Sequence, residues 1–321
     1  MPIIDFYAHV SLPRFLSVEE CLRLMDENDV EAAVLSTAET CPDVQELSRA
    51  RTRHPDRFRV VGMPLGADVA GMRDGIREQL DSGFSGIRLP AALVARNPDL
   101  LDLIGEARAF AIFVGNRGLS EAAGLIADFL DRYPASFAVA GHFGGPAEPT
   151  LLLQDAAVRR LFGHPSLYVA FTRHAALQHL PVQDWAAVVA EFVGWDRLLW
   201  GSEWPVALWR NETYASTLAW AERLHPSERA LQAFRHDNAR RLLFSGAAPP
   251  ARRIAPELDL MPFRKHADVW LFPPSLDLSE EHHRRLHQAY VACGGDKRGL
   301  YSTFVLEMAD RGIAASISRT A

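Results

Sequence analysis

Short apolar runs recur along the first 245 residues of the chain, and longer segments of mixed polarity alternate with them. The runs are rich in Val, Ile, Leu and Phe and lack polar alternation, which is typical of strands covered on both faces. The segments between them place apolar residues three or four positions apart, as amphipathic helices do. The pattern therefore predicts a regular alternation of strands and helices.

The expected elements fit one architecture. Eight strands separated by helices over about 240 residues is the count of a closed (β/α)8 TIM barrel. A doubly wound α/β sheet is the competing architecture, but it would not bring the first and last strands together. The predicted strands are residues 3–6, 32–36, 59–63, 86–89, 112–116, 137–141, 167–171 and 198–201. The predicted helices are residues 18–25, 44–54, 70–81, 99–110, 120–133, 183–194 and 216–224, the first opened by a Ser17–Glu20 capping box.

After residue 245 the pattern changes. Residues 245–274 contain six prolines, which predicts an extended crossing segment. Residues 279–293 and 300–311 then have the pattern of two helices. We expect two domains, a hydrolase-like barrel over 1–245 and a Pro-rich segment with a mainly helical extension over 246–321. A helical pair of this size has too little core to stand alone, so it would pack on the barrel or on a second copy in a homo-oligomer.

Composition and charge exclude several classes of protein. Apolar residues make up 48% of the chain and charged ones 23%, as in soluble enzymes. A net charge of -6 and a pI of about 6.1 argue against nucleic-acid partners. No run reaches the roughly 20 apolar residues of a membrane span, and the first strand leaves no room for a signal peptide. Three isolated cysteines agree with a cytoplasmic location.

Ionisable side chains follow the first and the last predicted strands. The first strand leads into Asp5-Phe6-Tyr7-Ala8-His9, and the last leads into Gly201-Ser202-Glu203-Trp204-Pro205. At the carboxyl ends of barrel strands, side chains from the first and last strands lie side by side and face one pocket. We therefore expect His9 and Glu203 to be partners across the mouth of the barrel.

Five motifs in order along residues 1–245 carry a family resemblance. The chain resembles the amidohydrolase-related branch of the amidohydrolase superfamily, and within it lactonases of the pyrone-dicarboxylate type. The motifs are Asp5-Phe6-Tyr7-Ala8-His9, Gly86-Ile87-Arg88, Gly141-His142-Phe143-Gly144-Gly145-Pro146, Gly201-Ser202-Glu203-Trp204-Pro205 and Asn238-Ala239-Arg240-Arg241-Leu242.

The resemblance implies catalytic roles for four residues. Glu203 stands where the family has the aspartate that activates the hydrolytic water, and it extends the carboxylate by one methylene. His9 stands at the second histidine of the opening motif, and Tyr7 replaces the first. A phenol is a poor zinc ligand, but it can donate a hydrogen bond to a carbonyl oxygen. His142 is implied to polarise the substrate or to transfer a proton.

The resemblance also implies substrate-binding residues. Arg88 and Arg173 stand at strand ends, where the lactonases hold substrate carboxylates with arginines, and Arg117 would join them. Arginine is the natural bidentate partner of a carboxylate, and surface ion pairing is the alternative for each of the three. A flat unsaturated acid would stack on Trp204, although ordinary core packing explains that residue equally well.

The donor set for a metal ion is incomplete. Zinc-dependent relatives use both histidines of the opening motif, a histidine at strand five and the strand-eight aspartate. Only His9 is retained here, and zinc sites take at least three protein ligands. We therefore expect no metal and no other cofactor, as the resemblance to the lactonase branch implies. A single zinc or manganese ion held by His9, His142 and Glu203 is the alternative.

These observations predict an enzyme, a metal-independent hydrolase. It would open a lactone or related ester-like bond of a small carboxylated substrate with a water that Glu203 deprotonates. Because two family positions are altered, a non-catalytic barrel that binds a ligand or partner stays open as an alternative. A metal-dependent decarboxylase or hydratase of the same superfamily is the other.

Overall fold

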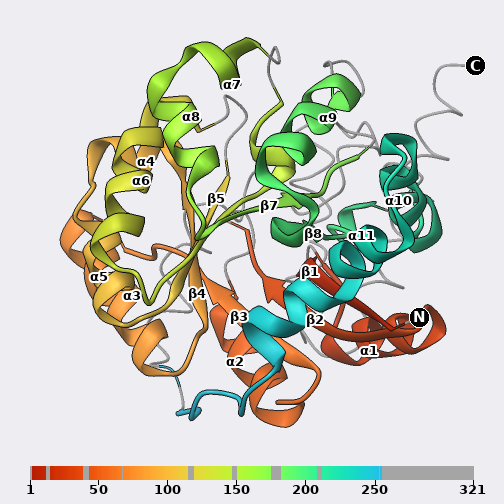
Figure 1. Ribbon diagram of the computed structural model, residues 1–321. Coiled ribbons are helices and arrows are strands. Elements are labelled where there is room, and N and C mark those ends of the chain that lie inside the picture. Colours follow the sequence, from red (N-terminus) through yellow and green to blue (C-terminus); the bar gives the residue numbers. More distant parts are fainter. Residues whose placement is uncertain are drawn as a thin grey trace, which may run out of the picture.

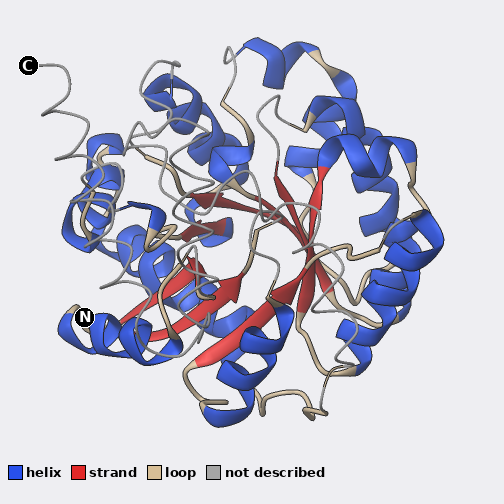
Figure 2. Ribbon diagram, turned by 180° about the vertical axis from the view of Figure 1, so that it is seen from behind, coloured by secondary structure: helices blue, strands red, loops and turns tan. Residues whose placement is uncertain are grey.

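The predicted barrel is confirmed. The computed structural model describes residues 2–11, 15–38, 43–66, 68–114, 119–146, 150–174, 182–207, 212–252 and 254. Over this part of the chain, eight strands form one parallel sheet in the order β1 to β8. Figure 1 shows the strands at the centre with helices around them, and Figure 2 shows the same ring from behind.

All eight predicted strands are present, with ends that differ by a few residues from those expected. The strands are β1 Ile3–His9, β2 Val30–Ser36, β3 Phe58–Gly62, β4 Gly86–Pro90, β5 Phe110–Val114, β6 Ala138–Ala140, β7 Leu167–Phe171 and β8 Leu198–Trp200. Their apolar side chains are almost all buried, because the barrel interior covers one face and the helices cover the other.

The helices largely follow the amphipathic segments. The Ser17–Glu20 capping box is present: the Glu20 N–H donates to Ser17 Oγ at 3.2 Å, and the Ser17 N–H donates to the Glu20 carboxylate at 3.3 Å. The helix expected over 99–110 ends at Glu106, because its last residues turn and begin β5. The α-helices are α1 Val18–Glu27, α2 Val44–Arg53, α3 Val69–Asp81, α4 Ala91–Arg96, α5 Leu100–Glu106, α6 Ala123–Arg132, α7 Thr150–Gln154, α8 Ala156–Gly163, α9 Val182–Val193, α10 Tyr214–Trp220 and α11 Glu228–Gln232.

Shorter helical turns complete the ring. After α11 the chain continues in two π-type turns to the end of the barrel domain, and 3-10 turns lie between other elements. The π-type turns are Ala233–Asp237 and Arg240–Phe244, and the 3-10 turns are Ser120–Ala122, His142–Gly144, Trp195–Arg197 and Ala221–Leu224. Helices α4, α7, α8 and α11 were not predicted, because segments of five to eight residues are too short to establish a helical period.

Two apolar clusters fill the structure. Ile4 and Phe6 of β1 lie in the cluster inside the barrel, together with Ile112 of β5. Leu35 and Phe113 lie in the larger cluster between the strands and the helices. Burying one such side chain stabilises the fold by about 1.5–3 kcal/mol, so the two clusters supply most of the driving force for folding. The polar chemistry is left to the strand ends.

Two backbone hydrogen bonds close the barrel between β1 and the chain that follows β8. The Glu203 N–H donates to the Tyr7 carbonyl at 2.7 Å, and the His9 N–H donates to the Trp204 carbonyl at 2.7 Å. Because β8 itself ends at Trp200, this closure is made by the turn after the strand. It places the backbone of Glu203 beside that of Tyr7, and the expected partnership of Glu203 with His9 stays a prediction.

A buried carboxylate reinforces the closure. Asp5 Oδ1 accepts from the Ser202 N–H at 2.9 Å and from the Tyr7 N–H at 3.1 Å, and Oδ2 accepts from the Ser202 hydroxyl at 2.5 Å. The close packing of the turn after β8 against β1 needs a glycine at position 201. A Cβ there would lie 2.7 Å from both Tyr7 Cβ and Thr172 Cγ2. Asp5 thereby fixes the backbone beside two predicted catalytic residues.

The chain beyond the barrel is described only as far as residue 254. Arg51 donates to the Ser82 carbonyl at 3.2 Å and also to the Pro249 carbonyl, and Arg252 pairs with Glu78 at 2.8 Å. These contacts fasten the first residues after the barrel to α2 and α3. The predicted helical extension lies outside the described residues, and the predicted division into two domains stays a prediction.

Among the described helices, none has the length and apolar character needed to cross a membrane.

We expect Ser202→Ala to lower the free energy of unfolding by about 1–3 kcal/mol, because it removes a hydrogen bond to a buried carboxylate. The measurement is urea unfolding followed by circular dichroism. Ser245→Ala is the matched control: its hydroxyl bonds to the Arg241 carbonyl on an exposed helical turn, so a change within about 0.5 kcal/mol is expected. Equal losses of unfolding free energy in the two variants would show that the Asp5–Ser202 hydrogen bond stabilises the fold no more than an exposed one.

Candidate active site

Most of the predicted site residues lie at the carboxyl ends of the strands, on the side where barrel enzymes place their chemistry. Two are on β1, one is on β4, and the others directly follow β6, β7 and β8. These residues are Tyr7, His9, Arg88, His142, Arg173 and Glu203. Arg117 lies outside the described residues, so its predicted role stays a prediction.

The carboxylate of Glu203 lies between a guanidinium and an imidazole. Arg173 Nε donates to Glu203 Oε1 at 2.7 Å, and His142 Nε2 lies 3.9 Å from the same oxygen. The Glu203 side chain is 2% exposed and that of Arg173 is 32% exposed. Burial disfavours the guanidinium charge, but the Glu203 carboxylate outweighs it and raises the pKa of Arg173. The two charges therefore stabilise each other at the edge of the site.

Tyr7 lies between the two histidines. Its ring packs edge to face against His9, with centroids 5.1 Å apart, and against His142, with centroids 5.4 Å apart. Arg88 Nε donates to the Tyr7 hydroxyl oxygen at 2.8 Å. The phenol oxygen thus accepts from a cation, which leaves its own proton for donation to another oxygen.

His9 is buried and held from two sides. Its Nδ1 donates to the Ser36 carbonyl at 3.1 Å, and its ring stacks on Phe15 with centroids 4.7 Å apart. Burial lowers the pKa of His9 to about 3, although the Glu203 carboxylate opposes the shift. His9 is therefore a neutral imidazole at physiological pH.

His142 is also buried and neutral. Its N–H donates to Thr172 Oγ1 at 3.1 Å, and its Nδ1 lies 2.5 Å from that same oxygen. Burial, followed by the nearby Arg173 charge, holds the pKa of His142 well below its usual range. Thr172 fixes both the backbone and the ring of His142.

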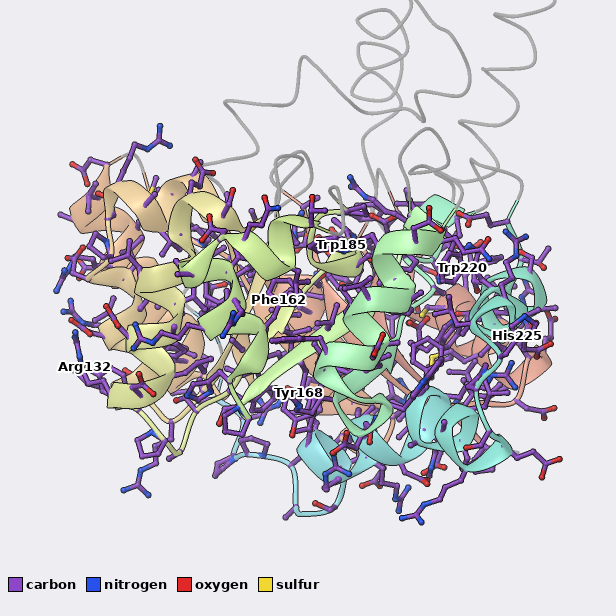
Figure 3. All side chains as sticks on the ribbon, turned by 45° about the horizontal axis from the view of Figure 1, so that its top comes forward. Arg132, Phe162, Tyr168, Trp185, Trp220 and His225 are labelled. Atoms are coloured by element: carbon purple, nitrogen blue, oxygen red, sulfur yellow. The ribbon has the colours of Figure 1, made fainter. Side chains whose placement is uncertain are left out.

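An aromatic layer supports the loop that carries His142. Trp185 Nε1 donates to the carbonyl of Phe143 at 2.8 Å. The Trp185 ring packs edge to face on Phe162, with centroids 5.9 Å apart; Figure 3 labels both residues on helices of the outer ring. The layer connects α8 and α9 to the end of β6 and restricts the movement of the histidine loop.

Three consecutive strands end in the same unusual backbone conformation. The φ angles of His142, Arg173 and Glu203 are 53°, 60° and 58°, in the left-handed region that side chains other than glycine rarely adopt. Such a residue costs about 1 kcal/mol or more, and residues of this kind cluster at functional sites. The conformation turns the chain sharply at each strand end and gathers the three side chains.

Comparisons with known proteins agree with this geometry. The family model described as "Amidohydrolase" matches residues 5–244. The chain belongs to the amidohydrolase family. The expectation of an amidohydrolase-related hydrolase on a TIM barrel is thus confirmed. No curated protein matches this amidohydrolase in sequence.

Solved structures share the fold of this amidohydrolase. A probable 2-pyrone-4,6-dicarboxylic acid hydrolase from Acinetobacter baumannii, with citric acid bound, has a TM-score of 0.59 and 17% identity, covering 77% of this chain and 100% of that chain. A candidate enzyme of the same description from Pseudomonas putida has a TM-score of 0.58 and 24% identity, covering 75% and 96%. An amidohydrolase from Burkholderia multivorans with bound zinc has a TM-score of 0.56 and 18% identity, covering 75% and 99%.

The zinc-bound neighbour raises the question of a metal in this amidohydrolase, and its residues do not fit one. Among the described residues, no three His, Cys, Asp or Glu side chains group closely enough to hold an ion. Tyr7 replaces an imidazole ligand and its oxygen accepts from Arg88, while Glu203 accepts from Arg173. Two guanidinium groups therefore contact the oxygens that a cation would need.

Several site residues were not predicted from the sequence. The two histidines are held by Ser36 and Thr172, and Asp5 is held by Ser202. All three are hydroxyl residues at or just beyond strand ends, and that position was the one sequence signal of their role. Trp204 is buried, and its ring stacks on Tyr214 with centroids 4.7 Å apart, as core packing would have it. Its assignment to substrate binding stays a prediction.

The buried histidines predict that this amidohydrolase loses stability in acid. Below about pH 6.5 the unfolded chain protonates His9 while the folded chain does not until about pH 3, so the free energy of unfolding falls by up to about 1.4 kcal/mol per pH unit as the pH drops. Asp5 acts in the opposite sense: burial raises its pKa from 3.8 to about 6, so the folded state holds a proton that the unfolded state lacks.

Urea unfolding at pH 7, 6 and 5 checks this. His9→Gln should flatten the pH dependence between pH 6.5 and 5 relative to the unmodified chain. His225→Asn is the control, because His225 is exposed on the outer helices (Figure 3) and asparagine accepts its left-handed φ of 51°. Parallel curves for His9→Gln and the unmodified chain would contradict the assignment of His9 as a buried neutral residue.

Proposed function

We propose that this amidohydrolase hydrolyses a lactone or related ester-like bond in a small carboxylated substrate without a metal ion. The observation that carries the proposal is the buried Glu203 carboxylate, held by Arg173 and 3.9 Å from the neutral His142. A carboxylate fixed in this way at the carboxyl end of the barrel supports a role as general base.

In the proposed reaction Glu203 takes a proton from a water molecule while the water oxygen bonds to the substrate carbonyl carbon. The carbonyl π electrons move to the oxygen and give a tetrahedral oxyanion. When the oxyanion collapses, the bond between that carbon and the ring oxygen breaks, and protonated Glu203 returns its proton to the leaving oxygen. Lactone and water thus give a hydroxy acid, and the base is regenerated.

Hydrogen-bond donors around Tyr7 support the oxyanion. The Tyr7 hydroxyl accepts from Arg88, so its proton is available to the developing negative charge. His142 lies beside both Tyr7 and Glu203 and is neutral. A neutral imidazole can polarise a carbonyl without protonating the Glu203 carboxylate. His9 packs against the other side of Tyr7.

The two arginines provide the carboxylate recognition. Each guanidinium has five N–H donors, and the contacts to Tyr7 and Glu203 use the Nε–H alone. Arg88 and Arg173 can therefore hold their partners and still present donors to a substrate anion. A neighbouring structure that contains citric acid, a tricarboxylic acid, supports a substrate of this charge type.

We expect Glu203→Gln to lower kcat by at least about a hundredfold on the active substrate, since it removes the general base, while the amide keeps the contact with Arg173. Glu203→Asp should lower kcat by about a hundredfold as well, because it withdraws the carboxylate by about 1.5 Å.

The assay is turnover of a panel of carboxylated lactones and esters, with citrate binding by calorimetry as the control for an intact site. Glu203→Gln should bind citrate with a Kd within about threefold of the unmodified chain. Full turnover by Glu203→Gln would remove Glu203 as the base. If the unmodified chain turned over no substrate but still bound citrate, the result would favour the non-catalytic, ligand-binding barrel.

The two arginines should respond differently to substitution. Arg88→Met should raise KM at least about tenfold, which corresponds to about 1.4 kcal/mol. Arg173→Met should raise KM and also lower kcat, because it removes the Arg173 guanidinium that donates to the buried Glu203 carboxylate. Arg132→Met, which breaks an exposed ion pair with Asp102 and a contact with the Tyr133 ring, is the control and should leave both constants unchanged. If Arg173→Met left kcat unchanged, Arg173 would have no role in the chemical step.

A further inference from the structure

The two buried histidines of the site differ in what their Nδ1 atoms contact. His9 Nδ1 lies 3.1 Å from the Ser36 carbonyl oxygen, which can only accept, and 3.2 Å from the Ser36 hydroxyl. His142 Nδ1 lies 2.5 Å from the Thr172 hydroxyl, which can donate. Both rings are neutral, so each carries a single ring proton, and the partner of Nδ1 decides which nitrogen holds it.

For His9 the carbonyl settles the position of the proton. A carbonyl oxygen requires a donor, so the proton lies on Nδ1 and the Ser36 hydroxyl can serve as a second acceptor for it. Nε2 of His9 then has a lone pair and no proton.

For His142 the bonding of Thr172 gives the opposite result. The Thr172 side chain is fully buried, and its oxygen already accepts from the His142 backbone N–H at 3.1 Å. Within the described residues, its other hydrogen-bond neighbour is His142 Nδ1. The single hydroxyl proton thus has Nδ1 as its acceptor, and a buried hydroxyl proton without an acceptor would be costly. The ring proton of His142 must then lie on Nε2.

Glu203 favours the same arrangement. His142 Nε2 faces the carboxylate oxygen at 3.9 Å, too far for a hydrogen bond but close enough for a strong electrostatic effect at a buried position. An N–H directed at a carboxylate is attracted, and a nitrogen lone pair is repelled. Two independent contacts, one at each ring nitrogen, therefore select the same tautomer.

We propose that Thr172 is a positioning residue that fixes His142 as the Nε2–H tautomer, while Ser36 fixes His9 as the Nδ1–H tautomer. The two imidazoles then have opposite capacities at Nε2: His142 donates and His9 accepts. This gives the two histidines different roles. In the proposed hydrolysis His142 donates to the oxyanion, and His9 accepts from a hydroxyl or water proton. That catalytic meaning rests on the proposed function, whereas the tautomers themselves do not.

The test is long-range proton–nitrogen NMR of the full chain labelled with 15N-histidine. His142→Gln and His9→Gln assign the two signals by their disappearance. The expected result is a protonated Nε2 with an unprotonated Nδ1 for His142, and the reverse for His9. A His142 ring with its proton on Nδ1 would overturn the proposal whether or not any turnover has been found.

Two substitutions at Thr172 test the positioning role. Thr172→Val keeps the shape but removes the hydroxyl, so the His142 signals should shift toward a mixture of tautomers. Thr172→Ser keeps the hydroxyl and should keep the single tautomer. With an active substrate, Thr172→Val should lower kcat about tenfold or more with KM within about threefold, and Thr172→Ser should restore kcat. An unshifted His142 in Thr172→Val, or equal kcat losses in both variants, would contradict the role.

Discussion

The carboxylate of Asp5 is the contact on which the site depends. It accepts three hydrogen bonds from the first strand and from the turn after the last strand, and it does so at a fully buried position. Burying a carboxylate is costly, and the three donors offset part of that cost, since burial still raises the pKa of Asp5 to about 6. Because Tyr7 donates one of these bonds and Ser202 precedes Glu203, the carboxylate sets the relative position of phenol and base. Closure of the barrel and assembly of the site are therefore one event.

The site combines positive charge with neutral acid–base groups. Arg88 contacts the uncharged Tyr7 hydroxyl and Arg173 contacts the Glu203 carboxylate, so Arg88, Arg173 and Glu203 together carry one net positive charge. Two imidazoles beside them stay uncharged because they are buried. A local excess of positive charge suits an anionic substrate, although the chain as a whole has a net charge of -6. The overall charge of the chain therefore does not indicate the charge of the site.

The strands and the residues at their ends could be predicted from the sequence, because short apolar runs are a local signal. His9 and Glu203 became candidates for that reason, and His142 became one through the family resemblance of its motif. The pairs Arg173–Glu203 and Arg88–Tyr7 could not be predicted, since they depend on how the strands are arranged around the barrel, and β1 and β4 are not adjacent in the sheet. Thr172 and Ser36 were missed because hydroxyl residues are common at strand ends, and only their contacts distinguish them.

The three left-handed residues at the ends of β6, β7 and β8 have a consequence for engineering. Glycine or asparagine would adopt these φ angles with less strain. At 173 that gain is opposed, because the change removes a cation from the buried Glu203 carboxylate. At 142 and 203 such changes gain backbone stability as they remove the functional side chain. A directed-evolution campaign that scores only heat resistance would accumulate substitutions at these positions. Thermostable descendants obtained in that way would keep the barrel and lose the chemistry.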